Sequence, residues 1–124
     1  MYIASPNETH FEYAKKAIEA GKHVLSEKPL SFTKKESEVL YTSAKEKGVV
    51  LMEAVKAAYC PGFQQLINVA KSGKIGDIVD VEASFTRLAD PLSRERTDAE
   101  YGGAFLEFGP SVLVPVIKLM GKDY

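Results

Sequence analysis

The residues best suited to chemistry fall in two short polar segments, each directly after an apolar run. Residues 5–10, Ser-Pro-Asn-Glu-Thr-His, follow one run, and residues 26–29, Ser-Glu-Lys-Pro, follow the next. Asn7 and His10 can both donate and accept hydrogen bonds. Lys28, beside a glutamate, could hold a ribose hydroxyl or polarise a carbonyl while a hydride moves, because lysine amines serve acid–base steps when burial lowers their pKa. The functional interpretation of the two segments is thus a site that binds a ribose and polarises a reacting carbonyl.

Both segments also have a structural interpretation. Asn7 or Thr9 could cap a helix that has His10 in its first turn. The Glu-Lys pair at 27–28 could be a solvated surface pair beside a turn, and Pro29 could adopt the cis form and so aim the lysine. On the residues alone, the structural interpretation is favoured for each segment.

The surrounding pattern predicts where the two segments lie. Apolar runs alternate with amphipathic helices in the order strand 2–4, helix 11–18, strand 23–26, helix from the Thr33–Glu36 capping box to Gly48, and strand 49–52. Continuous apolar strands separated by helices predict right-handed crossovers in a parallel sheet. Ligands bind such sheets at the carboxyl ends of the strands, where both polar segments fall.

The second half follows a different pattern. Pro61 is placed to start a helix that Gly73 ends. Apolar and polar residues alternate from 79 to 85, which predicts a strand of an antiparallel or mixed sheet, and residues 89–100 are predicted to be a loop. The apolar segment 104–120 contains Gly109-Pro110 and Pro115, so a helical turn followed by a helix kinked near Pro115 is expected.

Composition excludes several classes of function. The 124 residues carry 16 basic and 17 acidic side chains, a net charge of −1, which gives no support for binding nucleic acid. The apolar runs are far shorter than the ~18 residues of a membrane helix, so no membrane association is expected. A lone Cys60 cannot form an internal disulfide and favours a cytoplasmic location. No metal site is predicted.

Both halves are expected to be incomplete. The first predicted strand begins at residue 2 with nothing before it, and the strand at 79–85 has no convincing partner later in the chain. An exposed strand edge usually pairs with another chain, so a homo-oligomer is expected.

Five strings, in order along nearly the whole chain, resemble one known family. They are Y-I-A-S-P-N at 2–7 with His10, E-A-G-K-H-V-L-S-E-K-P at 19–29, E-A at 53–54, S-G-K-I-G-D at 72–77 and G-G-A-F-L-E-F-G at 102–109. They are similar to the glucose–fructose oxidoreductase, inositol dehydrogenase and rhizopine-catabolism (Gfo/Idh/MocA) family. The second string is highly specific.

The resemblance implies an α/β fold in two parts. Residues 1–53 would be the C-terminal part of a Rossmann-like dinucleotide-binding domain with a parallel sheet. Residues 54–124 would begin a substrate and oligomerisation domain with a mixed, mostly antiparallel sheet. The implied activity is hydride transfer between NAD or NADP and a hydroxyl or carbonyl of a sugar or polyol.

The resemblance also implies roles for individual residues. The cofactor-binding set would be Ser5, Pro6, Asn7, His10, Glu27, Lys28 and Pro29. Lys28 would also contact the substrate and act in catalysis. The glycine-rich loop of the family would lie upstream of residue 2, where a helix N-terminus holds the pyrophosphate. The 124-residue chain alone is therefore expected to bind dinucleotide weakly or not at all, and to be inactive.

Three positions in the second half complete the candidate site. Glu107 and Ser111 stand where many relatives carry an Asp and a catalytic His or Tyr, so they are candidate catalytic residues; shaping a helix start is an equally good role for them. A serine hydroxyl does not titrate near neutrality and is a poor general acid. Tyr101, before two glycines, is a candidate for stacking on a sugar.

The leading hypothesis is an NAD(P)-dependent oxidoreductase. One alternative is a non-catalytic protein of the same family that senses a dinucleotide or sugar, which the replacements at Ser111 and Val114 would suit. Another is an inactive, self-associating fragment.

Overall fold

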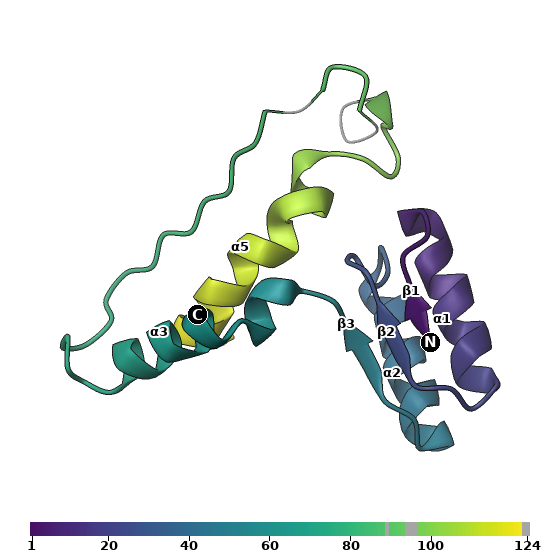
Figure 1. Ribbon diagram of the computed structural model, residues 1–124, viewed down its shortest axis with the longest axis horizontal. Helices are drawn as coiled ribbons and strands as arrows, with labels where there is room; N and C mark the ends of the chain where they lie inside the picture. Colours follow the sequence, from purple (N-terminus) through teal and green to yellow (C-terminus); the bar gives the residue numbers. More distant parts are fainter. Residues whose placement is uncertain (89, 94–96, 123–124) are drawn as a thin grey trace. The chain divides into compact units, whose positions relative to one another are not determined.

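The computed structural model describes residues 1–88, 90–93 and 97–122. The chain divides into two compact units, residues 1–54 and residues 55–124 (Figure 1). The first unit contains a sheet and two long helices, whereas the described part of the second is helical with one long irregular segment.

The first unit is a three-stranded parallel sheet with two crossover helices. Its strands are β1 (Tyr2–Ile3), β2 (Val24–Ser26) and β3 (Leu51–Glu53), arranged in the order β1-β2-β3. The short 3-10 helix η1 (Asn7–Thr9) and α1 (His10–Glu19) connect β1 to β2, and α2 (Lys34–Lys47) connects β2 to β3. The parallel pairing confirms the predicted topology, although β3 begins two residues later than expected.

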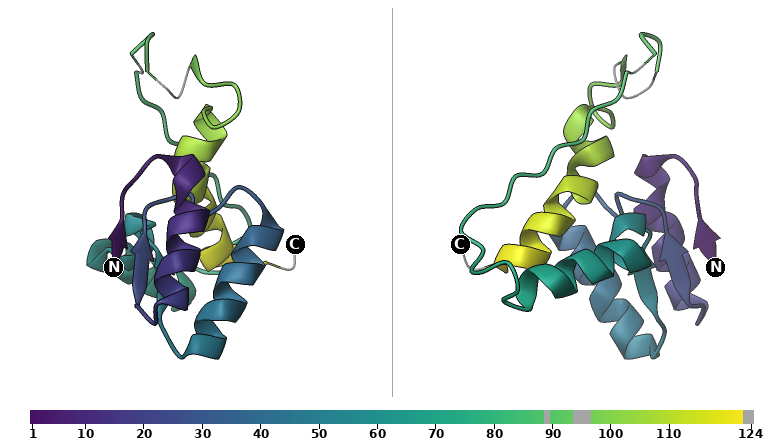
Figure 2. Two further views of the ribbon diagram at one scale, coloured as in Figure 1. Left: turned by 90° about the vertical axis from the view of Figure 1, so that its right-hand side faces the viewer. Right: turned by 60° about the vertical axis from the view of Figure 1, so that its left-hand side comes forward.

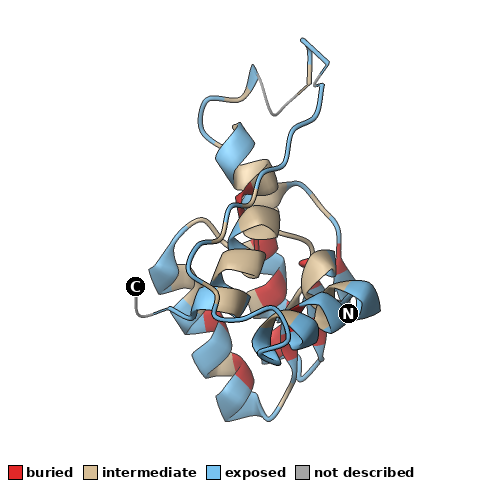
Figure 3. Cartoon of the chain, turned by 90° about the vertical axis from the view of Figure 1, so that its left-hand side faces the viewer, coloured by how far each residue is buried: buried red, intermediate tan, exposed pale blue. Residues whose placement is uncertain are grey.

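The core of this unit lies between the sheet and its helices (Figures 2 and 3). Each strand turns alternate residues inward, and the core comprises Ile3, Val24 and Leu51 with Ala14, Ala17, Ile18, Leu30, Leu40 and Ala44. On the opposite face, the three in-register residues Tyr2, Leu25 and Met52 are exposed. The packing of α1 and α2 on one face is what two right-handed crossovers in this strand order produce.

Local signals fix the ends of α2 as predicted. The Thr33 hydroxyl accepts from the Glu36 N–H at 3.2 Å, and the Glu36 carboxylate accepts from the Thr33 N–H at 3.0 Å, which completes a capping box. Gly48 ends the helix with φ 64°, a left-handed conformation that glycine adopts without a Cβ penalty.

The second unit contains η2 (Lys56–Tyr59), α3 (Pro61–Lys71) and α5 (Ala104–Met120). Pro61 occupies the first position of α3, as expected of a residue whose missing N–H would have no helical partner. Both α3 and η2 contact α5. Among the described residues, no helix is long and apolar enough to cross a membrane.

Two predictions for the second unit are wrong. The strand expected at 79–85 is not formed, and residues 76–88 contain neither helix nor strand. An alternating segment needs a neighbouring strand to satisfy its backbone groups, and none of the described residues supplies one. The region 104–120 is one helix, not a turn followed by a helix. Pro110 and Pro115 each remove only one N–H, and bonds at both ends of α5 persist, from Glu107 N to Gly103 O and from Gly121 N to Ile117 O.

Candidate functional site at the carboxyl ends of the strands

The three strands end side by side at one edge of the sheet. Backbone hydrogen bonds continue past the strands, from Glu27 N to Ile3 O at 2.8 Å and from Ala54 N to Ser26 O at 2.7 Å. The segments after β1, β2 and β3 are therefore held next to one another. This edge is where ligands bind parallel α/β sheets, and both polar segments lie at it.

The His10 side chain contacts two of these segments, the one after β1 and the one after β2. It is fully buried, with Nδ1 2.7 Å from the Pro29 carbonyl oxygen and Nε2 2.9 Å from the Ser5 carbonyl oxygen. Carbonyl oxygens only accept, so a neutral ring donates to one of them and an imidazolium donates to both. Both ring nitrogens thus face backbone groups, whereas the resemblance implied a cofactor contact for this residue.

Ser5, Pro6 and Thr9 form a tight turn after β1. The Thr9 hydroxyl lies 2.6 Å from the Ser5 hydroxyl and 2.7 Å from the Pro6 carbonyl oxygen, which also accepts from the Thr9 N–H at 2.9 Å. The predicted capping role is therefore wrong for Thr9, the N-cap residue of α1, because its side chain bonds backward to the turn. Asn7 is the first residue of η1, two positions before the N-cap of α1, so it does not cap α1 either.

The turn after β2 carries the candidate catalytic lysine. The Lys28–Pro29 peptide bond is cis, the form that the sequence suggested as possible. Pro29 is buried, whereas the side chains of Glu27 and Lys28 are half-buried. The Tyr2 hydroxyl donates to Glu27 Oε1, and this bond, followed by desolvation and charge repulsion, raises the pKa of Tyr2.

Glu53 also contacts the turn after β2. In the sequence it stood out only as part of the E-A string at 53–54. Its Oε1 accepts from the N–H of Leu30 at 2.8 Å, and Leu30 is only 3% exposed. A carboxylate as the last residue of a strand, at the ligand-binding edge, was the signal that could have identified it.

The candidates in the second unit lie on α5 and before it. Glu107 and Ser111 are one helical turn apart and half-buried, so they share a face of α5. Glu107 is in the first turn, where a carboxylate suits the helix dipole, but Ser111 lies inside the helix and cannot cap it. Tyr101 is half-buried, and its N–H donates to Asp98 Oδ1 at 2.7 Å.

An apolar hollow in the second unit lies beside other residues. It has a volume of about 400 Å³ and is lined by Ala83, Ser84, Phe85, Ala104, Phe105, Phe108, Gly109 and Val112. The Phe85 and Phe108 rings stack at 4.8 Å between centroids, and the Arg87 guanidinium lies 5.2 Å from the Phe108 centroid. No sequence pattern indicated this hollow, and its lining does not include Tyr101, Glu107 or Ser111.

Metal-ligating side chains do not gather among the described residues of either unit. Within residues 1–88, 90–93 and 97–122, there is no group of three or more His, Cys, Asp or Glu side chains that could hold an ion.

Comparison with known proteins finds relatives of the chain that are oxidoreductases. Residues 1–55 match the model of an oxidoreductase family with an NAD-binding Rossmann fold. The chain is 37% identical, over 124 residues, to the dTDP-3,4-didehydro-2,6-dideoxy-α-D-glucose 3-reductase of Actinomadura kijaniata. It is 34% identical, over 129 residues, to the NADP⁺-dependent scyllo-inositol 2-dehydrogenase IolU of Bacillus subtilis. These alignments cover 99% and 98% of this chain, but only 37% and 39% of the two relatives.

A solved structure gives the same result. KijD10, a 3-ketoreductase from Actinomadura kijaniata in complex with NADP and TDP-benzene, is 38% identical and superposes with a TM-score of 0.76, covering 87% of this chain and 34% of that one. The chain thus spans about a third of the length of the relatives that it matches. Sequence and structure agree along nearly all of residues 1–124, and the chain belongs to the Gfo/Idh/MocA family of oxidoreductases, whose dinucleotide-binding domain has a Rossmann fold.

Proposed function

We propose that the protein is an NAD(P)-dependent oxidoreductase that acts on a sugar, a polyol or a related compound. The observation that carries the proposal is the position of Lys28, in a turn held at the carboxyl edge of a parallel sheet by bonds from both neighbouring segments. The named relatives, a dTDP-sugar reductase and an inositol dehydrogenase, support this range of substrates.

The arrangement suits a dinucleotide. The backbone of the turn is buried and hydrogen-bonded, while the Glu27 carboxylate and the Lys28 amine are half-buried and can reach a ligand. Glu27 is suited to accept from ribose hydroxyls, and Asn7 to bond the nicotinamide half. Residues 1–124 contain no G-x-G-x-x-G string, and the proposal assigns none of the residues named here to the pyrophosphate.

Lys28 has the chemical role in this proposal. The reduced nicotinamide supplies a hydride to the carbonyl carbon of the substrate. The Lys28 ammonium donates a hydrogen bond to the carbonyl oxygen and passes it a proton as the alcohol forms. In the oxidation direction, the neutral amine accepts the hydroxyl proton. Ser111 cannot replace this acid because its hydroxyl stays protonated near neutral pH.

A chimera tests the proposal. Residues 1–124 would replace the matching segment of the Actinomadura kijaniata reductase, and turnover would be followed by the absorbance of NADPH with the dTDP-sugar as substrate. Lys28→Ala should lower kcat by about 10²- to 10⁴-fold, the contribution typical of general acid–base catalysis, with little change in NADPH affinity. Lys22→Ala, at an exposed lysine before β2, should leave turnover unchanged. Full turnover with alanine at 28 would contradict the role of the lysine.

A second candidate function is a non-catalytic sensor of a dinucleotide or sugar. Ser111 and Val114 favour it, because neither side chain can supply an acid or base to a reacting hydroxyl. The chimera separates the two functions. NADPH binding without turnover over a panel of sugars and polyols supports the sensor, whereas reproducible hydride transfer excludes it.

Location and assembly complete the proposal. A single cysteine, Cys60, is exposed and unpaired, which suits a reducing cytoplasm. A homo-oligomer is proposed because the apolar alternation at 79–85 has no partner strand among the described residues. Light scattering tests the assembly, and an inactive, self-associating fragment would be refuted by a monomer that binds NADPH at micromolar concentration.

A further inference from the structure

The turn that carries Lys28 is held at two consecutive residues from opposite sides. The Pro29 carbonyl oxygen lies 2.7 Å from His10 Nδ1, on the helix that follows β1. The next backbone group, the Leu30 N–H, donates to Glu53 Oε1 at 2.8 Å, at the end of β3. Since β2 is the central strand, the turn after it is fixed by one side chain from each flanking segment.

The residues His10 and Leu30, which take part in these two bonds, are more buried than Glu27 and Lys28, whose side chains the anchored turn would position. His10 is 0% exposed and its bond to Pro29 is buried, whereas the bond from Leu30, a residue only 3% exposed, to the half-buried Glu53 is partly buried. An unpaired backbone group in that environment would lose its partner without gaining a solvent bond, which makes other conformations of the turn unfavourable. Glu27 and Lys28, directly before these anchored groups, keep half-buried side chains that can reach a ligand.

The location and contact of Glu53 distinguish it from a residue that only stabilises the fold. Glu53 is half-buried at the strand end, outside the apolar core cluster, and its carboxylate bonds the backbone two residues after Lys28. Removing this contact frees the Leu30 N–H while leaving the packing of Ile18 and Leu40 in place. A displacement of about 1 Å at a reacting group can cost about 10²-fold in rate, so even a small shift of the turn would be measurable.

We infer that Glu53 is a positioning residue, which acts opposite His10 to fix the backbone from which Lys28 reaches the reacting carbonyl oxygen. The inference rests on the proposed function of Lys28. It assigns Glu53 no proton transfer: its carboxylate oxygen serves as a hydrogen-bond acceptor, and its effect on turnover passes through Lys28.

The test uses the chimera and variants at Glu53, Glu46 and Lys28. Glu53→Ala should lower kcat about 10- to 100-fold while the NADPH Kd changes less than about twofold, because ground-state binding does not need the final orientation of the amine. Glu53→Gln keeps an oxygen that can accept from Leu30 N and should restore kcat to within about threefold of the parent. Glu46→Ala, at an exposed glutamate of α2, is the matched control and should match the parent. Thermal unfolding of each variant checks that the chimera remains folded.

The decisive measurement is the double variant. If Glu53 acts through Lys28, adding Glu53→Ala to Lys28→Ala should lower kcat no further, because two residues that act as a unit are not additive. A full additional loss in the Lys28→Ala background would overturn the inference, and so would parent-like kcat for Glu53→Ala or failure of Glu53→Gln to rescue. An unmodified chimera without turnover, beside an active parent reductase, would reject the proposed function and this inference with it. A Lys28→Ala loss without a Glu53→Ala loss would reject the inference alone.

Discussion

The two units of the chain contrast in how much of their apolar surface finds a partner. In residues 1–54, Ile18 and Leu40 are fully buried, and all three strands contribute to one core. In the described part of residues 55–124, the buried apolar side chains are Val55 and Ile67, while Val79 is 89% and Leu88 100% exposed. The first unit therefore contains both sides of its main interface, the strands and the helices that cover them.

The two units also differ in how far apart in the sequence the segments that must pack together lie. Each helix of the first unit packs against strands that directly precede or follow it, so its contacts are local and need little loop closure. The alternating residues of segment 79–85 need a partner strand that the described residues do not provide. We conclude that a βαβ unit can form from neighbouring segments, whereas a strand of a mixed sheet depends on distant ones.

The largest expected effect comes from matched leucine truncations in the two units. Leu40→Ala in α2 removes a side chain with 0% exposure and should destabilise the chain by about 2–5 kcal/mol, the cost of a core cavity. Leu66→Ala in α3, at a leucine that is 55% exposed, should change stability by less than about 0.5 kcal/mol. Both changes are Leu to Ala within a helix, so helix propensity largely cancels. Urea unfolding followed by circular dichroism measures the difference, and equal losses would break the contrast in burial.

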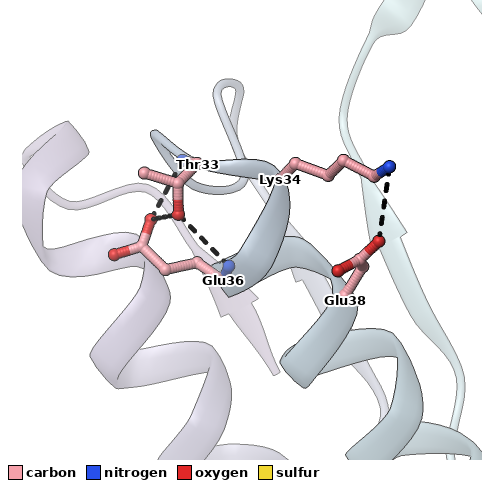
Figure 4. Close-up of polar contacts among 4 residues, drawn as sticks. All are labelled: Thr33, Lys34, Glu36 and Glu38. Carbon is pink, nitrogen blue, oxygen red and sulfur yellow. Dashed lines mark hydrogen bonds and ion pairs between the residues drawn. The ribbon is translucent and has the colours of Figure 1, made fainter.

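A smaller effect is expected at the helix starts. Thr33 caps α2 with a reciprocal bond to Glu36, shown in Figure 4, so Thr33→Ala should cost about 1 kcal/mol. Cys60, at the corresponding position of α3, makes no side-chain cap bond, so Cys60→Ala should change stability by only a few tenths of a kcal/mol. The same unfolding experiment compares the pair. A loss for Cys60→Ala as large as that for Thr33→Ala would show that the capping geometry does not decide helix stability here.

Much of the first unit could be predicted from sequence because its signals are local. The Thr33–Glu36 box and Gly48 sit at the ends of α2, and the apolar residues of α1 recur at helical spacing. Segment 79–85 was misassigned because period-two alternation reports only which residues could share a sheet face, not whether a partner strand is present. Region 104–120 was misassigned because prolines lower helix propensity, but contacts with α3 and η2 are compatible with one continuous helix.

The candidate site could be predicted only in part, because some of its contacts join residues that are distant in the sequence. Strand order places Asn7 and Lys28 at one edge, which alternating strands and helices suffice to indicate. The partners of His10 could not be predicted, because hydrogen bonds to the Ser5 and Pro29 carbonyl oxygens depend on how two loops meet in space. Glu53 was underestimated for the same reason: its acceptor role needs the Leu30 N–H, 23 positions away in the chain. The cofactor-binding roles of these residues, and those of Glu107, Ser111 and Tyr101, stay predictions.

The smallest expected effect concerns charges at helix ends. Here the larger loss of stability is expected in the second unit. Lys34 and Glu38 form an ion pair at 3.7 Å on α2, with side chains 89% and 63% exposed (Figure 4). Lys34 lies in the first turn, where the helix dipole disfavours a cation, so Lys34→Ala should change stability by less than about 0.3 kcal/mol. Lys71 lies in the last turn of α3, where the dipole favours a cation, and Lys71→Ala should cost about 0.3–0.5 kcal/mol at low salt. Thermal unfolding at low and high salt measures both variants, and the Lys71 loss should shrink as salt screens the charge. A larger loss for Lys34→Ala would mean that the exposed pair, rather than the helix dipole, dominates the electrostatics of these helix ends.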